Sequence, residues 1–211
     1  MGYLEPITKK DFNELLMHLK CIDYSCFNSS ADSGVLESIT ALSNSRGGAV
    51  FIGVNENQKV IGCFPEKEII FMKEQLETLH SGLSCIFNTY IIKNKIIVGI
   101  QVQRSNSKVA VIGLNKTKAY YFRLNRKTLP VNKIITLIWK LEQSENTIHF
   151  NSDALLILKL LQETQKMTLS MIYRSSNLAL KVVDNTMAFL VYSKKVEMFF
   201  ENDQIYYKIK D

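Results

Sequence analysis

The sequence predicts an α+β protein of two domains, an N-terminal mixed sheet with helices and a C-terminal group of three helices followed by a β-hairpin. Three observations lead to this prediction. Apolar residues recur at helical spacing early in the chain, alternate in β-rich runs between residues 85 and 124, and return to helical spacing after residue 150. The polar stretch 142–150 separates the patterns, so we place the domains at residues 1–145 and 146–211.

The N-terminal elements follow from periodicity and caps. Thr8 suits the N-cap of a first helix, and a second helix ends before Gly47-Gly48. The expected helices are 8–20, 35–42, 68–79 and a last one that Pro130 opens and Leu141 ends; the expected strands are 49–54 and 60–62 as a hairpin, then 85–92, 96–103, 109–112 and 119–124.

The C-terminal elements have the order of a winged helix, a helix-turn-helix variant. Ser152 is expected to cap a helix over 153–162, and Thr168 or Ser170 starts a short second helix. The third helix covers 178–193, and strands 196–200 and 205–209 follow as a hairpin. Three helices and a hairpin in this order predict a winged helix-turn-helix domain.

Four of the nine glycines lie between Ser43 and Gly62, in Ser-Asn-Ser-Arg-Gly-Gly-Ala-Val-Phe-Ile-Gly-Val-Asn-Glu-Asn-Gln-Lys-Val-Ile-Gly. A phosphate-binding glycine loop follows a strand and precedes a helix, whereas here the glycine pair follows a helix and precedes a strand. We therefore expect a geometric role. Gly47 supplies a left-handed C-cap, Gly48 lets the strand start tightly, and Gly53 lies where a side chain does not fit.

The cationic residues are distributed unevenly. The net charge is +6 and the pI is about 9.0, which suits a polyanionic partner. No Asp or Glu occurs between Glu77 and Glu142, and this acid-free segment carries eleven cations: Lys93, Lys95, Arg104, Lys108, Lys116, Lys118, Arg123, Arg126, Lys127, Lys133 and Lys140. The acid-free segment therefore predicts a positively charged surface. The alternative to a binding surface is an ordinary solvated face without a partner.

Several classes of protein are disfavoured by the residues. The four cysteines, at 21, 26, 63 and 85, lack the paired spacing of a metal site, so we expect free thiols and no metal. No apolar run is long enough to span a membrane and the N-terminus does not resemble a leader, so we expect a cytoplasmic protein. No Gly-x-Ser-x-Gly, His-Glu-x-x-His or Walker lysine is present, so we expect no enzyme and no cofactor.

The segment Ala41–Gly62 resembles the signature of the Schlafen AlbA-type DNA-binding domain, with its asparagine, its glycine pair and its Ile-Gly-Val strand in register. Tyr120-Tyr-Phe-Arg123 with Thr128 resembles a later segment of the same family. The resemblance spans about residues 10 to 141. It implies an α+β domain, often joined to a C-terminal winged helix in bacterial regulators.

The sequence departs from the family where chemistry is concerned. Some Schlafen-type domains cleave RNA with a metal held by two glutamates and an aspartate, and the resemblance places Cys21, Cys26 and Asn55 at these positions. Magnesium and manganese need hard oxygen ligands, which thiols do not replace. Asp23 and Asp32 lie nearby as substitutes, but a lone loop carboxylate is more often a cap or solvated.

We therefore expect a DNA-binding transcriptional regulator that contacts double-stranded DNA and forms a homo-oligomer. The residues expected to contact nucleic acid are Arg46, Lys93, Lys95, Arg104, Lys108, Lys116, Lys118, Arg123, Arg126, Lys127, Lys181 and Asn185. The structural motif consists of Asn44, Gly47, Gly48 and Gly53. One alternative is a non-catalytic assembly module whose winged helix serves oligomerisation, and a lesser one is a Schlafen-type nuclease.

Two local expectations accompany this reading. Strand alternation divides Tyr120, Tyr121 and Phe122 between the core and an exposed face. On the third C-terminal helix, Lys181, Asp184, Asn185 and Ala188 are expected to point outward, so Asp184 would oppose an approaching phosphate backbone.

Overall fold

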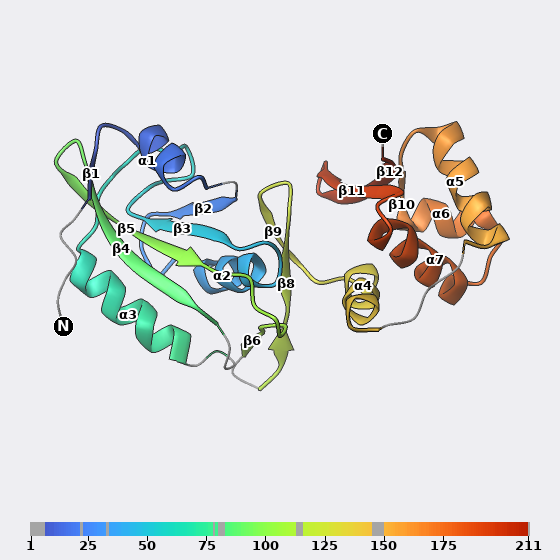
Figure 1. Cartoon of the computed structure of the whole chain (residues 1–211), viewed down its shortest axis with the longest axis horizontal. Helices are drawn as coiled ribbons and strands as arrows, with labels where there is room; N and C mark the ends of the chain where they lie inside the picture. Colours follow the sequence, from blue (N-terminus) through green and yellow to red (C-terminus); the bar gives the residue numbers. More distant parts are fainter. Residues whose placement is uncertain are drawn as a thin grey trace. The chain divides into compact units, whose positions relative to one another are not determined.

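The computed structural model describes residues 7–21, 23–32, 34–77, 79, 83–112, 116–144 and 150–210 (Figure 1). The chain divides into two compact units, Met1–Pro130 (unit 1) and Val131–Asp211 (unit 2). The mixed α+β class expected from the sequence is confirmed.

Unit 1 is built on a five-stranded mixed sheet with the order β1-β4-β5-β3-β2. Its strands are β1 (Ile7–Lys9), β2 (Tyr24–Phe27), β3 (Gly48–Ile52), β4 (Cys85–Ile92) and β5 (Lys95–Val102). β2 pairs parallel with β3 and β1 pairs parallel with β4, whereas β5 pairs antiparallel with both β3 and β4. The sheet therefore combines hairpin and crossover connections.

Helices cover both faces of this sheet: α1 (Phe12–His18) packs on one face, and α2 (Val35–Ser43) and α3 (Pro65–Glu77) pack on the other (Figure 1). Alternate residues of β3 serve the two cores. Ala49 and Phe51 lie in the cluster that contains α1, while Val50 and Ile52 lie in the cluster of α2 and α3. Burial on both faces explains why β3 is a continuous apolar run.

Two short antiparallel ribbons complete unit 1, β6 (Val111–Ile112) with β7 (Lys118–Ala119) and β8 (Tyr121–Leu124) with β9 (Lys127–Pro130). The turn between β8 and β9 consists of Asn125 and Arg126, whose φ angles are 48° and 61°. Left-handed backbone at both central residues is the pattern of a type I′ turn, which matches strand twist. This turn gives Arg126 a defined place beyond the end of β8.

Several expected elements differ in unit 1. Thr8 lies in β1, and Asp11 caps α1 instead, because its carboxylate accepts from the backbone N–H of Glu14 at 2.9 Å. Val60 forms only an isolated bridge to Val54 rather than a hairpin strand. Pro130 ends β9 rather than opening a helix. The unexpected strands β1 and β2 are short and are defined by pairing partners distant in the sequence, which local periodicity does not reveal, whereas β9 pairs with the adjacent β8 across the turn of Asn125 and Arg126.

Unit 2 consists of α4 (Lys133–Gln143), α5 (Ser152–Thr164), β10 (Met167–Thr168), α6 (Leu169–Ser176), α7 (Leu180–Tyr192), β11 (Val196–Glu201) and β12 (Gln204–Ile209). The expected succession of three helices and a hairpin is present as α5, α6, α7 and β11–β12. The short β10 adds a third strand, in the order β10-β12-β11. Asn151 and Thr168 cap α5 and α6 with their side chains.

The division between the units falls earlier than the expected boundary at residue 145. Helix α4 belongs to unit 2, because its fully buried Ile134 packs in one cluster with Ile157 of α5 and Met187 of α7. Residues 145–149 of the expected linker lie outside the described part of the chain.

Asp184 is fully buried, contrary to the outward position expected for it on α7. Its carboxylate accepts from the hydroxyl of Tyr173 on α6 and pairs with Lys133 at the start of α4. Burial, together with the bond to this carboxylate, raises the pKa of Tyr173 to about 12. Ala188 is also buried, so the exposed face of α7 carries Lys181 and Asn185 without Asp184.

The glycine pair forms the turn between α2 and β3, where other backbone segments lie very close. Gly47 has φ 79° and donates its N–H to the Leu42 carbonyl at 2.9 Å, while Gly48 has φ 151°. A Cβ on Gly48 would lie 2.3 Å from the Asp23 carbonyl oxygen, and one on Gly47 would lie 2.7 Å from that of Val102. Close approach of backbone from β5 and from the segment before β2 therefore accounts for both glycines.

A substitution at Gly48 should be costly. We expect Gly48→Ala to lower the free energy of unfolding by about 2 to 5 kcal/mol, because left-handed strain and a backbone clash add together. Gly34→Ala is the matched control, since Gly34 also has positive φ, at 92°, but a Cβ there meets only a ring atom of Phe27 at 3.8 Å. Urea unfolding followed by circular dichroism measures both; equal losses would contradict the clash.

Candidate nucleic-acid interface

Asn44, directly after α2, joins three segments of unit 1. Its side chain is almost completely buried. The amide nitrogen donates to the carbonyls of Val109 and Tyr121, at 2.8 and 3.0 Å, and its oxygen accepts from the N–H of Val109 at 2.7 Å. This clamp holds the segment after β5 and the start of β8 against the end of α2.

Arg123 on β8 is the centre of a second joint. Its Nε donates to both carboxylate oxygens of Asp23, at 3.2 and 3.1 Å, and its Nη2 donates to the same carboxylate at 2.6 Å and to the carbonyl of Tyr24 at 3.0 Å. Nη1 donates to the hydroxyls of Ser25 and Thr128, at 3.1 and 2.8 Å. Protein acceptors therefore satisfy all of the N–H donors of the Arg123 guanidinium.

The position of Arg123 differs from the expectation that it contacts nucleic acid. Its side chain is only 3% exposed, and a guanidinium whose donors all point inward has none left for a phosphate. The joint extends to α2, because the hydroxyl of Thr128 lies 3.0 Å from that of Ser38 and the backbone N–H of Arg123 donates to the Ser45 hydroxyl at 2.9 Å. Arg123 therefore fixes β8 and β9 to β2 and α2.

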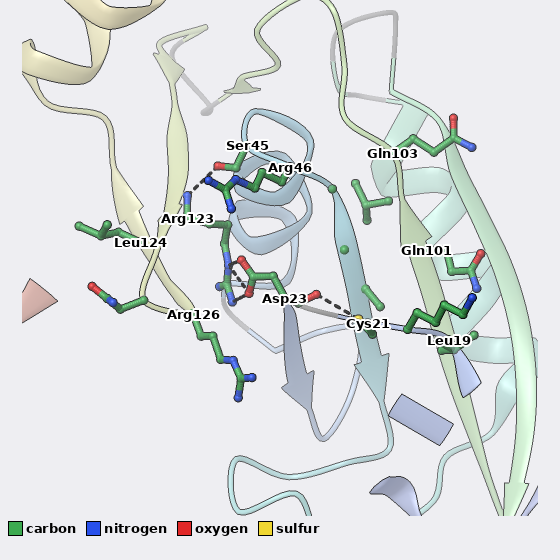
Figure 2. A pocket seen from close by; sticks show the side chains of 16 residues that line it. Leu19, Cys21, Asp23, Ser45, Arg46, Gln101, Gln103, Arg123, Leu124 and Arg126 are labelled. Atoms are coloured by element: carbon green, nitrogen blue, oxygen red, sulfur yellow. Dashed lines mark hydrogen bonds and ion pairs between the residues drawn. The ribbon is translucent and has the colours of Figure 1, made fainter. Parts of the chain in front are cut away.

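A pocket of about 770 Å³ lies beside this joint (Figure 2). It is bounded by the segment that follows α1, the turn from α2 into β3, the end of β5 and the turn between β8 and β9. The lining residues are Leu19, Lys20, Cys21, Asp23, Ser45, Arg46, Gly47, Gly48, Ala49, Gln101, Val102, Gln103, Arg123, Leu124, Asn125 and Arg126. All of them belong to unit 1.

The lining is cationic. Lys20, Arg46 and Arg126 are exposed, and within the described residues none of them pairs with a carboxylate. Arg123 and Asp23 neutralise each other. The helix end adjoining the pocket is weakly negative at most, because the Leu42 carbonyl accepts from two backbone N–H groups and Ser105 donates to the Ser43 carbonyl. The pocket therefore attracts anions.

The structure brings together only part of the expected contact set. Arg46 and Arg126 both line the pocket. Arg104 does not line it, but its backbone lies next to the lining residue Gly47, because a Cβ built on Gly47 would lie 3.3 Å from the backbone nitrogen of Arg104. Lys93 and Lys95 line a different cavity of about 500 Å³, beside the turn between β4 and β5. The remaining expected contacts in unit 1, all at least partly exposed, are Lys108, Lys116, Lys118 and Lys127.

Sequence reasoning missed several polar residues of the pocket, among them Lys20, Gln101 and Gln103. No local pattern marks them. Lys20 follows α1, Gln101 lies near the end of β5 and Gln103 directly follows that strand, so only the fold places them at one cavity. Of the three aromatic residues, Phe122 is buried in the core, whereas Tyr120 and Tyr121 are half-buried.

The carboxylates considered as metal ligands serve other purposes. Asp23 holds Arg123, and Asp32 accepts from the backbone N–H groups of Asn28 and Ser29, at 2.8 and 3.1 Å. Burial raises the pKa of Cys21 and raises that of Cys26 to about 12, so both thiols stay protonated at neutral pH. Among the described residues, no three His, Cys, Asp or Glu side chains gather as metal ligands.

Comparison with solved structures gives resemblances of low identity. A protein from Corynebacterium diphtheriae, DIP2311, is 14% identical with a TM-score of 0.43, and the match covers 71% of this chain and 31% of that protein. The N-terminal domain of a protein from Nitrosomonas europaea, named as related to the ATP-dependent DNA helicase RecG, is 16% identical with a TM-score of 0.34; 68% of this chain and 92% of that domain are covered. This chain therefore spans about a third of DIP2311.

No protein among those with curated descriptions matches the sequence. Across the described residues, no helix has both the length and the apolar character required to cross a bilayer. The family model described as Schlafen, AlbA_2 matches residues 22–132, which is more than half of the chain and includes the glycine pair, Asn44 and the Arg123 joint. The chain therefore belongs to the Schlafen AlbA_2 family.

Proposed function

We propose that this protein binds nucleic acid through the cationic surface of unit 1 and acts as a DNA-binding transcriptional regulator. The observation that carries the proposal is the acid-free segment, whose cations apart from Arg123 are at least partly exposed in unit 1. Arg46 and Lys20 extend this positive surface into the pocket. A concentration of cations in a segment that contains no Asp or Glu favours a phosphate backbone over a partner of mixed charge.

Unit 2 supports a second contact. The order α5, β10, α6, α7, β11 and β12 is that of a winged helix, in which α7 would be the recognition helix. Lys181 and Asn185 are exposed on α7, and the buried pairing of Asp184 removes the acid that would have opposed DNA. An asparagine can read adenine with two hydrogen bonds, whereas a lysine mainly contacts phosphate.

The alternative use of unit 2 is assembly. Leu155 on α5 and Leu180 on α7 are 62% and 60% exposed, and Met171 on α6 is 44% exposed. Exposed apolar side chains of this size favour a protein contact when they form one patch. In that case unit 2 would join copies of the chain while unit 1 held the nucleic acid, and the expected homo-oligomer would follow.

The first test addresses unit 1. Changing Arg104, Lys108, Lys116 and Lys118 to Glu should abolish binding to duplex DNA in fluorescence anisotropy, and binding by the unchanged protein should weaken steeply with salt. The control changes Lys10, Lys59, Lys67 and Lys73 to Glu, which gives the same net charge on exposed unit 1 residues outside the acid-free segment. Equal losses in both variants, or none, would refute the proposed surface.

The second test addresses α7. Asn185→Ala should lower affinity for a selected DNA site more than for random DNA, by about 1 to 3 kcal/mol, because it removes base contacts. Lys181→Ala should weaken both about equally, because it removes a phosphate contact. If neither variant changes binding while the four-charge variant does, unit 2 serves assembly instead.

The third test concerns catalysis. We propose that the protein has no nuclease or ATPase activity with Mg²⁺ or Mn²⁺, because protonated thiols at Cys21 and Cys26 and the paired Asp23 offer no hard, open ligand set. Incubation of labelled RNA, labelled DNA and ATP with each metal should leave all three intact. Cleavage that follows the protein peak through a second chromatographic step would contradict this.

A further inference from the structure

We propose that the 770 Å³ pocket of unit 1 is a subsite for one unpaired nucleotide of a nucleic-acid strand. This inference rests on the proposed function and adds to it a preference for single-stranded ends or loops. Three properties of the pocket carry it: its size and shape, the placement of its cations, and the internal pairing of its carboxylate.

The size suits one nucleotide rather than a duplex. Pockets of 300 to about 1,000 Å³ enclose small ligands of roughly this size. A nucleotide within a duplex is stacked and paired, and it enters such a cavity only after it leaves the stack, which costs a few kcal/mol. A nucleotide in a single-stranded overhang does not meet that cost. The cavity therefore favours unpaired strands over an intact duplex.

The cations are placed to hold a phosphate from more than one side. In Figure 2, Arg46 and Arg126 lie on opposite sides of the Arg123–Asp23 pair. Arg126 is held in advance, because its backbone lies in the tight turn between β8 and β9 and its guanidinium lies 5.3 Å from the ring centre of Tyr24. A pre-positioned guanidinium loses little freedom on binding and offers a planar pair of donors to phosphate oxygens.

The single carboxylate of the lining does not oppose this use. Asp23 is 23% exposed, but Arg123 holds it with three short contacts, so an incoming phosphate meets a neutral pair. With four cationic side chains and one carboxylate, the lining keeps three net positive charges. That excess matches the charge of a phosphate group and its neighbours along a strand.

The rest of the lining can receive a base and sugar. Leu19, Ala49 and Leu124 supply apolar surface, and Gln101 and Gln103 supply amides. An amide presents donors and an acceptor together, which suits the mixed pattern on any unpaired base edge. No charged group other than those named lines the cavity within the described residues, so the chemistry fits an anion such as a nucleotide better than a metal cation.

The experiment compares three probes on the full chain by fluorescence anisotropy: a blunt duplex, the same duplex with a short single-stranded overhang, and the single strand alone. DNA and RNA overhangs are both used, and a preference for either supports the subsite. The unchanged protein should bind the overhang at least about tenfold more tightly than the blunt duplex, since no base has to leave a stack.

The double variant Arg46→Gln, Arg126→Gln should remove this preference, because it should lower affinity for the overhang about tenfold more than affinity for the blunt duplex, which the remaining surface cations still meet. Its salt dependence on the overhang should fall by a slope of about 1 to 1.5, as expected for two lost phosphate contacts. The matched control, Lys93→Gln with Lys116→Gln, removes two exposed cations that do not line the pocket. It should lower both affinities slightly and keep the preference.

The outcomes separate the subsite from the proposed function. Equal affinity of the unchanged protein for all three probes, or equal losses in both double variants, would overturn the subsite and leave nucleic-acid binding intact. Absence of binding to every probe would refute the proposed function itself. Thermal unfolding of each variant by circular dichroism checks the fold; because Arg46 and Arg126 are exposed, both should unfold within a few degrees of the unchanged protein.

Discussion

The ion pair between Arg123 and Asp23 is the interaction on which the arrangement of unit 1 depends. A buried guanidinium is tolerated only when its charge is paired and its donors are satisfied. Here one carboxylate pairs the charge, and that carboxylate, one carbonyl and two hydroxyls accept all of the hydrogen bonds. These acceptors come from the β2 region and from β9, so a single side chain fixes the relation of the β8–β9 ribbon to the edge of the main sheet. The pocket lies beside the Arg123–Asp23 joint, and the position of the β8–β9 ribbon that the joint fixes forms part of its wall.

The same pairing decides the charge that a partner would meet. Each unit holds one acid close to its proposed contact surface, and each is neutralised inside the protein: Asp23 by Arg123 in unit 1, and Asp184 by Lys133 in unit 2. A formal charge count treats these acids as repulsive to phosphate. Each pairing uses one cation for one acid, so the net charge is unchanged but the two acids no longer oppose a phosphate, and Arg46, Arg126 and Lys181 determine how the surface interacts.

The glycine pair and Asn44 show how a family signature arises from packing alone. Gly47 and Gly48 allow three backbone segments to approach within distances that a Cβ would forbid, and Asn44 satisfies backbone groups on two of the segments nearby. The side chains that would contact a ligand lie next to these residues and are not the same ones. The signature therefore builds the wall of a pocket, and the residues that line it set what the pocket binds.

By itself the sequence determined the α+β class, most helices, the hairpin strands of β4, β5, β11 and β12, and the one-signed character of the acid-free segment, because each is encoded in local periodicity, turn residues or composition. It did not determine β1, β2 or β10, whose few residues become strands only by pairing with distant partners, or β9, which pairs with the adjacent β8 across a turn of Asn125 and Arg126 that lacks the usual glycine. Nor did it tell that Arg123 and Asp184 point inward, or that Lys20, Arg46 and Arg126 meet at one cavity. Only the tertiary structure decided these points, since burial and long-range pairing depend on contacts between residues up to a hundred positions apart, such as Arg123 and Asp23.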